Sequence, residues 1–362
     1  MKSIPKIVFS GGPCGGKTQA IKYIKEHLEK LGFHVVTVTE SAANVLADGF
    51  DRNLPTYEFQ KAIALKQIEN ENNAEEKAKK LNNPVILCDR GLMDSRVYLN
   101  DRDFERLKTE LNLCEIDLRD RYDAVFHLDS TSNSNTQTYK QEDIRIENRD
   151  EACALNEKSL RAWCGNPHYR FIPVCDTFDE KAELLKKEVN AFLGIPRHLE
   201  IERKFLIKYP DLKLLNSLPC SKAEITQTYM ISHNNRFRLR KRGEKGNYIY
   251  IKTEKRKISE TVREEIETRL KQEEYENLLN TNTKIGSISK DRYCLMYNGT
   301  YYEIDIFPFW KNQAYLEIEL NSEDDKINIP KFLSVIEEVT YKPEYRNIAL
   351  CQQIPKEIDT KL

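Results

Sequence analysis

The first half of the chain, up to about residue 195, alternates short apolar runs with longer segments of helical periodicity. One long helical segment runs from Glu58 to Leu81, with Phe59, Ile63 and Ile68 expected on its buried side. Continuous apolar strands separated by helices are typical of a parallel sheet that helices cover on both faces. The runs are Lys6–Phe9, Val35–Val38, Val85–Cys88, Ala124–Leu128 and Arg170–Val174.

Beyond Gly194–Pro196 the apolar residues instead recur at every second position, in segments that turn signals separate. Arg236–Arg240 is an example, and eight such segments can be counted within residues 200–320. A helical segment at about Gln272–Leu279 interrupts them, and we expect a further helix near the end of the chain. Many short strands with period-two alternation are typical of an antiparallel barrel.

A chain of 362 residues is longer than one hydrophobic core usually organises, which agrees with this change of pattern. We predict an α/β domain with a parallel sheet over residues 1–195. Over residues 196–362 we predict an α+β domain built on an eight-stranded antiparallel β tunnel.

The charge of the chain is balanced: 57 basic and 58 acidic residues give a formal net charge of −1. No global field would attract a polyanion, so we expect neither nucleic acid nor a membrane surface as a general partner. No stretch reaches the ~18 apolar residues of a membrane span. The nine cysteines are scattered without a C-x-x-C pair, which favours the reducing cytoplasm over a disulfide or zinc scaffold.

The first apolar run leads into a sequence that fits G-x-x-x-x-G-K-[ST]. The motif stands between a strand and a helix, where backbone N–H groups and the helix N-terminus can hold phosphate oxygens. Lys17 would bridge the β- and γ-phosphates of ATP or GTP, and Thr18 would ligate magnesium. The residues of this predicted phosphate loop are Gly11, Gly12, Cys14, Gly15, Gly16, Lys17 and Thr18.

Two further strand ends carry candidates for the same P-loop site, at Glu40 and at Asp89-Arg90. Asp89 is the expected second magnesium contact and Arg90 a phosphate or substrate contact, with a plain surface salt bridge as the alternative. After the polar segment Ser130–Asp143 comes Arg145, which as a lid arginine would offset charge on a transferred phosphoryl group. A solvated helix charge is the alternative for Arg145.

Charged residues recur at every second position through the second half of the chain. Residues two apart in a strand face the same way, so Glu200, Glu202 and Lys204 would share one face. Three charges on a face that a barrel buries are costly unless they bind something. The full set is Glu200, Glu202, Lys204, Arg236, Arg238, Arg240, Lys252, Glu265, Glu267, Lys290, Arg292, Asp305, Glu317 and Glu319.

Two explanations compete for this pattern. The charges face solvent and pair across strands, which is the commoner case for any single pair, or they line a cavity. Both signs recur across many strands, which favours a cavity with a basic wall that grips a polyphosphate and an acidic wall that holds Mg²⁺ or Mn²⁺. One metal ion would bridge phosphate oxygens, and a second would activate the attacking water.

The first half resembles the kinase-like AAA_28 family of P-loop proteins, which are related to nicotinamide riboside kinases and deoxynucleoside kinases. The phosphate loop, Glu40, Asp89-Arg90-Gly91 and the lid arginine carry this resemblance, in that order. It implies that Glu40 is a base or a substrate contact.

The second half resembles the CYTH, or triphosphate tunnel metalloenzyme, family. Its signature E-x-E-x-K corresponds to Glu200, Glu202 and Lys204, and E-x-E to Glu317 and Glu319. Five further family elements follow in order between these two motifs. They are R-x-R at Arg238 and Arg240, a single lysine at Lys252, an acidic pair at Glu265 and Glu267, K-x-R at Lys290 and Arg292, and an aspartate at Asp305. The resemblance implies that the residues of the first and last motifs are catalytic, namely Glu200, Glu202, Lys204, Glu317 and Glu319. It also implies a substrate such as tripolyphosphate, thiamine triphosphate, a nucleoside triphosphate or pyrophosphate.

The leading prediction is a metal-dependent phosphoanhydride hydrolase whose P-loop domain binds ATP or GTP as a regulator or second activity. A P-loop small-molecule kinase coupled to the tunnel is one alternative. The other is a non-catalytic sensor that binds GTP or a phosphoinositide headgroup. The acidic wall favours hydrolysis, because an anion receptor gains little from buried carboxylates.

Overall fold

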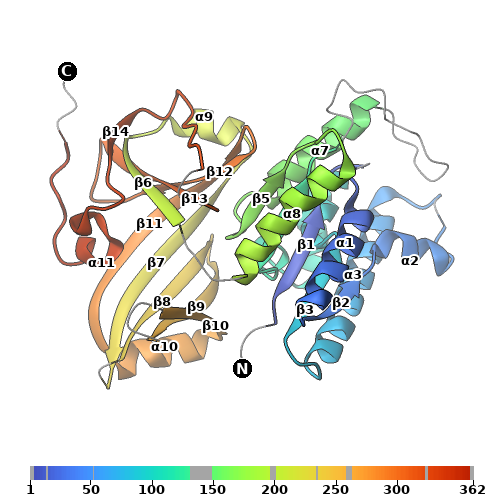
Figure 1. The fold of residues 1–362 in the computed structure, drawn as a ribbon, viewed down its shortest axis with the longest axis horizontal. Helices are drawn as coiled ribbons and strands as arrows, with labels where there is room; N and C mark the ends of the chain where they lie inside the picture. The colour runs from blue at the N-terminus through green and yellow to red at the C-terminus, as the bar shows by residue number, and fades with distance from the viewer. Residues whose placement is uncertain are drawn as a thin grey trace. The chain divides into compact units, whose positions relative to one another are not determined.

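A computed structural model describes residues 4–13, 15–51, 53–130, 149–195, 201–233, 235–257, 263–322 and 325–358; of residues 149, 255–257 and 263–265 it describes the backbone alone. The chain forms two compact units, one made mainly by residues 4–195 and the other mainly by the residues that follow (Figure 1). None of the helices within these ranges is long and apolar enough to cross a lipid bilayer.

The first unit is built on a five-stranded parallel sheet in the order β2-β3-β1-β4-β5. β1 lies in the middle and pairs Ile7 with Leu87 on one side and with Ala124 on the other. The strands are β1 (Lys6–Ser10), β2 (His34–Val38), β3 (Pro84–Asp89), β4 (Ala124–Leu128) and β5 (Tyr169–Ile172). They coincide with the five predicted apolar runs, and the prediction of a parallel α/β sheet is confirmed.

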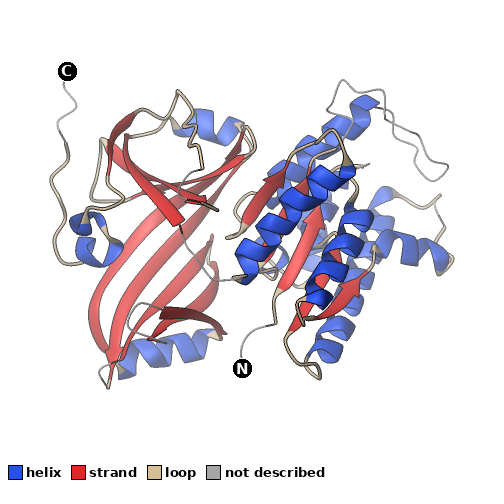
Figure 2. Ribbon diagram, in the orientation of Figure 1, coloured by secondary structure: helices blue, strands red, loops and turns tan. Residues whose placement is uncertain are grey.

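Helices lie on both faces of this sheet (Figure 2), which explains why β1 and β4 are buried along their whole length. α8 begins with a capping box between Thr177 and Glu180 and ends at Gly194 in a left-handed conformation. The helices are α1 (Lys17–Lys30), α2 (Ser41–Ala47), α3 (Thr56–Ala78), η1 (Leu92–Asp94), α4 (Ser95–Tyr98), α5 (Asp101–Leu111), α6 (Glu115–Arg119), α7 (Arg149–Trp163) and α8 (Phe178–Leu193).

The long predicted helix is α3, but its buried side differs from the prediction. Phe59, Ile63 and Ile68 are only half-buried, whereas Gln67 and Glu71 are buried. These polar side chains are satisfied by each other and by neighbouring groups, since Gln67 donates to Glu71 at 2.8 Å and the Tyr122 hydroxyl donates to Glu71 at 2.7 Å. Apolar periodicity alone does not reveal a buried face of this kind.

The second unit is a curled antiparallel sheet of nine strands, in the order β10-β9-β8-β7-β11-β12-β13-β6-β14 (Figure 1). The eight segments predicted within residues 200–320 are β6 to β13, and the short β14 adds a ninth strand beside β6. The strands are β6 (Ile201–Lys208), β7 (Cys220–Ser232), β8 (Asn235–Glu244), β9 (Asn247–Lys257), β10 (Arg263–Leu270), β11 (Thr283–Tyr297), β12 (Thr300–Ile306), β13 (Gln313–Leu320) and β14 (Val335–Glu338). The predicted fold class is confirmed.

Short helices complete the second unit, and one of them, α10, is the helix predicted at about Gln272–Leu279. They are α9 (Leu212–Ser217), α10 (Gln272–Thr281), η3 (Pro343–Tyr345) and α11 (Asn347–Leu350). One face of the sheet is apolar: Phe237 and Leu239 pack with Tyr275 of α10, and a second cluster on that face contains Phe205 and Leu316. The alternating charged residues are therefore left to the opposite face.

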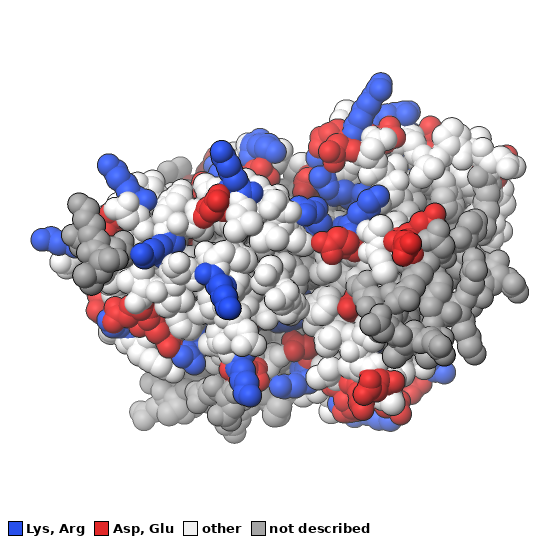
Figure 3. Space-filling model, turned by 90° about the horizontal axis from the view of Figure 1, so that it is seen from above, with Lys and Arg blue, Asp and Glu red and all other residues white. Residues whose placement is uncertain are grey.

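The outer surface carries no extended patch of one charge in the view of Figure 3, where basic and acidic side chains are interspersed. This agrees with the balanced composition of the chain.

Candidate functional site

The predicted phosphate loop lies between β1 and α1, against the end of β4. Gly11 has a φ of 129°, and a Cβ atom there would lie 2.2 Å from the carbonyl oxygen of Leu128. A Cβ atom on Gly15 would lie 2.8 Å from the same oxygen. The close approach of the loop to β4 therefore requires glycine at both positions.

Lys17 is the first residue of α1, and Gly16 before it has a left-handed φ of 77°. The Lys17 ammonium donates to the carbonyl oxygens of Gly11 at 3.2 Å and Gly12 at 2.8 Å. Burial and the nearby charge of Arg90 lower the pKa of Lys17 to about 7. A phosphate group in the loop would favour the charged ammonium, so the arrangement suits an anionic ligand.

Thr18 and Asp89, the two predicted magnesium contacts, lie together: Thr18 Oγ1 donates to Asp89 Oδ2 at 2.7 Å. Asp89 is the last residue of β3 and is buried, which raises the pKa of its carboxyl group. Its second oxygen, Oδ1, is also buried and accepts no hydrogen bond within the described part of the chain. A divalent cation would offset the cost of this unsatisfied oxygen, so the pair fits Mg²⁺.

Arg90 links the other strand ends to the phosphate loop. Its Nε donates to Glu40 at 2.9 Å, and its Nη1 donates to the Gly11 carbonyl oxygen at 3.2 Å. The guanidinium also lies 3.7 Å from Asp94, which accepts a 2.6 Å hydrogen bond from Ser10. The structure thus brings Glu40 and Arg90 together beside the loop, as the sequence predicts.

In the second unit, strand register gathers the predicted charges on the concave side of the curled sheet. Glu317 lies opposite Lys204, and Glu319 opposite Glu202. Residues directly opposite each other in an antiparallel pair share a face. We call this face the charged face; its residues are Glu202, Lys204, Arg236, Arg238, Arg240, Glu267, Lys290, Arg292, Glu303, Asp305, Glu317 and Glu319.

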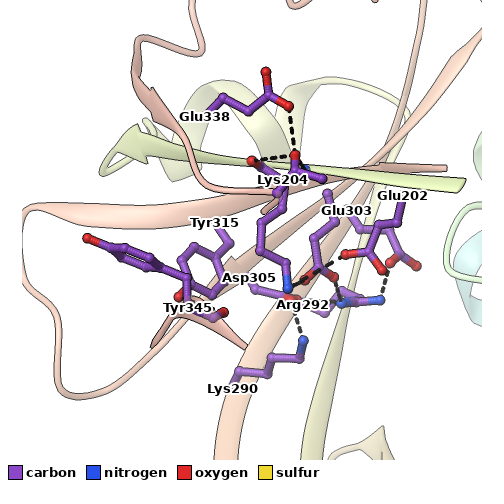
Figure 4. A network of polar contacts seen from close by, with 11 residues as sticks. Glu202, Lys204, Lys290, Arg292, Glu303, Asp305, Tyr315, Glu338 and Tyr345 are labelled. Carbon is purple, nitrogen blue, oxygen red and sulfur yellow. Dashed lines mark hydrogen bonds and ion pairs between the residues drawn. The ribbon is translucent and has the colours of Figure 1, made fainter. Parts of the chain in front are cut away.

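An ion-pair network on β11, β12 and β13 fills the middle of the charged face (Figure 4). Arg292 Nε and Nη2 donate to the two carboxylate oxygens of Asp305, each at 2.7 Å, and the guanidinium also contacts Glu303 and Glu317. Lys290 pairs with Asp305 as well, and both side chains are buried. These charges are therefore partnered within the protein.

Lys204 extends the network to β6. Its ammonium lies 2.8 Å from Glu317 and 3.6 Å from Glu202, and it sits 5.3 Å from the ring centre of Tyr315. Burial alone would lower the pKa of Lys204, but Glu317 and Glu202 together raise it above its usual value. Lys204 is therefore a permanent cation at neutral pH.

Glu202 and Glu319 are two further carboxylates of the charged face. They lie directly opposite each other on β6 and β13, where like charges repel. The Glu202 side chain is 50% exposed, and the negative charge of Glu317 together with burial raises its pKa to about 8. A divalent cation would offset this repulsion, and carboxylate oxygens suit Mg²⁺ or Mn²⁺. The chemistry of these residues fits the metal, although the described residues contain no group of three histidine, cysteine or acidic side chains already arranged to hold an ion.

Arg238 and Arg240 approach the same face from β8. They share one acidic neighbour, Glu267, at 3.5 Å from Arg238 and 3.9 Å from Arg240. Burial and the charge of Arg238 lower the pKa of Arg240 to about 10. Arg240 Nε is buried and donates to no acceptor in the ranges that the structure describes. Arg238 and Arg240 thus place two guanidinium groups on the same side of the charged face, an arrangement that suits a phosphate group.

Comparison with protein families follows the same division of the chain. The model of the AAA domain family (AAA_28) matches residues 6–181, and the model of the CYTH domain matches residues 198–344. The chain is an AAA domain fused to a CYTH domain. A search of curated proteins finds no match.

Two solved structures each match less than half of this chain. The hypothetical protein NE1496 is 29% identical and the inorganic triphosphatase NE1496 is 28% identical; each match covers 43% of this chain and 100% of the other, with a TM-score of 0.31. The fold of the CYTH domain is shown by its own strands and by the family match.

The register of the CYTH domain corrects the prediction for Lys252. Lys252 lies opposite Leu239 and 5.0 Å from the ring centre of Phe237, on the apolar face that α10 covers. The residue that faces Arg238 is its neighbour Thr253, which donates to Glu267 at 3.0 Å. Lys252 is therefore separated from the other predicted phosphate ligands.

Other predicted residues differ in how far the structure describes them. Arg236 shares the face of Arg238 but is exposed. Asp305, a predicted metal ligand, is buried between Lys290 and Arg292. Cys14, Arg145 and Glu200 lie outside the described residues, as does the side chain of Glu265.

The sequence prediction missed several residues of both sites. Glu303 stands two positions before Asp305, so the period-two rule that selected Asp305 also applies to it. Asp94 lies beside Arg90 but does not directly follow a strand, so the rule that selected Glu40 and Asp89 does not apply to it. Lys181 of α8 donates to the carbonyl oxygen of Gly15 at 3.0 Å. The two residues are far apart in the sequence, so no local motif indicates this contact.

Proposed function

We propose that the CYTH domain is a metal-dependent phosphoanhydride hydrolase that cleaves tripolyphosphate, a nucleoside triphosphate or pyrophosphate. The observation that carries the proposal is the charged face, where a basic side on β8 and an acidic side on β6, β12 and β13 share one concave surface. A site for anions alone would not place Glu202 opposite Glu319, because opposed carboxylates repel each other and also the ligand.

The roles follow from the surroundings of each side chain. We assign phosphate binding to Arg238 and Arg240, which place two guanidinium groups on one face of β8, and to Lys204 on β6. Arginine suits this task because its fork of donors matches phosphate oxygens.

We assign metal binding to Glu202 and Glu319, together with Glu317 and with Glu200 beyond the described residues. When bound, Mg²⁺ or Mn²⁺ would polarise phosphate oxygens and lower the pKa of a coordinated water. The protein's own part is to hold the phosphate chain between the arginines of β8 and the carboxylates of β6 and β13, so that the anhydride bond is fixed in place.

We further propose that residues 1–195 act as a separate nucleotide-binding domain that takes ATP or GTP with Mg²⁺, as a regulator or a second activity. Lys17 would contact the phosphates, and Thr18 with Asp89 would hold the metal. Arg90, which lies beside both Gly11 and Glu40, would contact phosphate or a phosphoryl acceptor. Loss of nucleotide binding in Lys17→Ala would test this assignment.

The hydrolase proposal is tested by phosphate release from tripolyphosphate, pyrophosphate, ATP and GTP with Mg²⁺ or Mn²⁺. Glu202→Gln is the test variant, since the side chain is half exposed and its loss spares the buried ion pairs. Lys252→Gln is the matched control on the opposite face of the same sheet. We expect Glu202→Gln to lower the rate by about 100-fold and Lys252→Gln to leave it unchanged.

The assay also separates the alternatives. Tight binding of a phosphorylated ligand without turnover under either metal would replace the hydrolase by a sensor. Phosphate transfer that depends on Lys17 and on an added acceptor would replace it by a kinase.

A further inference from the structure

Gln67, on the buried polar side of α3, uses the whole of its side-chain amide inside the protein. An amide has two N–H donors and one carbonyl oxygen. Gln67 Nε2 donates to Glu71 Oε1 at 2.8 Å and to the main-chain carbonyl oxygen of Arg90 at 3.2 Å. Its Oε1 accepts from the Ser41 hydroxyl at 2.6 Å. Because Gln67 is only 3% exposed, these three partners fix the orientation of the amide.

Two of the three partners stand next to the ion pair beside the phosphate loop. Ser41 directly follows Glu40, and Arg90 Nε donates to Glu40 at 2.9 Å. One amide group therefore holds the main chain of Arg90 and the residue that follows Glu40. These positions belong to separate strand ends, so no local hydrogen bond could link them.

Arg90 needs such support because of its backbone conformation. Its φ of 68° lies in the left-handed region, which a residue with a Cβ atom rarely adopts. Its N–H donates to the Phe9 carbonyl oxygen at 3.1 Å, and its own carbonyl group is turned toward α3, where it accepts from Gln67. A conformation of this kind persists only where the surrounding structure holds it.

Glu71 anchors the other side of the amide in the core. It is 0% exposed, accepts from the Tyr122 hydroxyl at 2.7 Å and lies 3.1 Å from Arg121 Nε. A buried carboxylate with these partners has little freedom to move. Gln67 therefore connects a fixed group in the core with Arg90.

We propose that Gln67 is a positioning residue of the AAA domain. It holds Arg90 in the left-handed conformation and so keeps the guanidinium between Glu40 and the carbonyl oxygen of Gly11, to which Arg90 Nη1 donates at 3.2 Å. The inference rests on the proposed nucleotide-binding function of this domain, in which Arg90 contacts phosphate or a phosphoryl acceptor, and Gln67 acts through Arg90.

The first test observes Arg90 itself in the full chain without nucleotide. An N–H group that donates to a carboxylate is held in place and should exchange slowly with water. Nitrogen-15 nuclear magnetic resonance of the arginine Nε–H groups detects this proton, and Arg90→Lys identifies its signal. Gln67→Met keeps the length of the side chain but removes the amide, so the Arg90 Nε–H should exchange at least about tenfold faster.

Asn70→Ala is the matched control. Asn70 Nδ2 donates to the same Ser41 hydroxyl at 3.3 Å from the same helix, and its removal leaves the bond from Gln67 to Arg90 in place. We expect the exchange of the Arg90 Nε–H to change by less than about twofold. If Gln67→Met does not fold, Gln67→Glu combined with Glu71→Gln keeps an amide paired with a carboxylate but removes the donor to Arg90, and the same faster exchange is expected.

The second test is a double-mutant cycle on nucleotide affinity, measured with a fluorescent ATP or GTP analogue and Mg²⁺. Gln67→Met and Arg90→Met should each weaken binding by about tenfold, and the double variant should bind no more weakly than Arg90→Met alone. A residue that only stabilised the fold would instead add its own loss to that of Arg90→Met.

Wild-type exchange of the Arg90 Nε–H in Gln67→Met would overturn the inference, and so would additive losses of affinity in the double variant. A failure of the proposed function looks different: the wild-type protein binds neither ATP nor GTP, or Arg90→Met binds them as tightly as the wild type. In both of these cases the exchange measurement still decides whether Gln67 positions Arg90.

Discussion

The candidate sites of the two units are built in different ways. In the AAA domain, the loop carbonyls of Gly11 and Gly12 hold Lys17, and one buried oxygen of Asp89 is left without a donor. In the CYTH domain, Lys290 and Arg292 are already neutralised by carboxylates. The first site is a cradle of backbone groups around Lys17, whereas the second is a network of ion pairs whose balance a metal ion and a phosphate chain would change together.

This difference predicts different weak points. The cradle depends on backbone conformation and should fail when a single Cβ atom is added. The lattice depends on paired charges and should respond in stability as well as in ligand binding.

The largest effect is expected for Gly11→Ala. The added Cβ atom would meet the Leu128 carbonyl oxygen at 2.2 Å, which the loop can relieve only by moving. Nucleotide affinity, measured with a fluorescent ATP or GTP analogue, should fall by more than about 100-fold. Gly32→Ala is the matched control, since Gly32 also has a positive φ of 86° but no atom within 4 Å of the new Cβ. Equal losses in both variants would contradict the cradle account.

The lattice is tested next by Lys290→Met. Removal of the ammonium leaves Asp305, which is 0% exposed, with Arg292 alone, and breaking a buried pair costs about 3 kcal/mol or more. Urea denaturation followed by circular dichroism should show this decrease in the free energy of unfolding. Lys245→Met removes an 83% exposed lysine that pairs with Glu244, and should change stability by less than about 0.5 kcal/mol.

Asp89→Asn sharpens the description of the cradle. The amide can still accept from Thr18, but it removes the negative charge that would hold Mg²⁺. The gain in nucleotide affinity on adding Mg²⁺ should shrink by about tenfold, while affinity in metal-free buffer is retained. Asp48→Asn, at the exposed end of α2, serves as the control. An unchanged Mg²⁺ dependence would remove Asp89 from the metal site.

The effect that is smallest per step concerns pH, is spread over several pH units and belongs to the AAA domain. His127 is buried under the phosphate loop, where burial lowers its pKa to about 3, and its Nε2 lies 3.1 Å from Asn156 Oδ1. The unfolded chain binds a proton near pH 6.5 that the folded domain does not bind until about pH 3, so stability falls as the pH falls through this window.

The slope due to one such group is at most about 1.4 kcal/mol per pH unit. It is measured by urea denaturation at several pH values, using the fluorescence of Trp163 in a Trp310→Phe background. His127→Gln, which can still donate to Asn156, should reduce the slope. A slope that is the same in both proteins would show that other groups dominate.

The sequence predicted the cradle well because its parts are local. The loop glycines, Lys17 and Thr18 lie within one short segment, and parallel strands bring Glu40 and Asp89 to the same edge of the sheet. Asp94 and Lys181 escaped notice because tertiary contacts alone place them beside Arg90 and Gly15.

The charged face was predicted in composition but not in detail. Lys245 and Gly246, with φ of 53° and 87°, form a tight turn that pairs Glu244 with Asn247 and thereby Leu239 with Lys252. A register shifted by one residue would have turned Lys252 to the charged face. The periodicity of a single strand does not contain this information. The same holds for Arg292, whose partners are 11 to 25 residues away in sequence.

The central claim is that the acidic wall converts phosphate binding into hydrolysis. The most direct measurement is ³¹P nuclear magnetic resonance of tripolyphosphate bound to an excess of the full-length protein. A first spectrum is recorded in EDTA. Mn²⁺ is then added, the reaction is quenched, the metal is removed and a second spectrum is recorded. The account predicts intact tripolyphosphate in EDTA and its conversion to pyrophosphate and phosphate after the metal is added. Bound tripolyphosphate that stays intact with Mn²⁺ would contradict it.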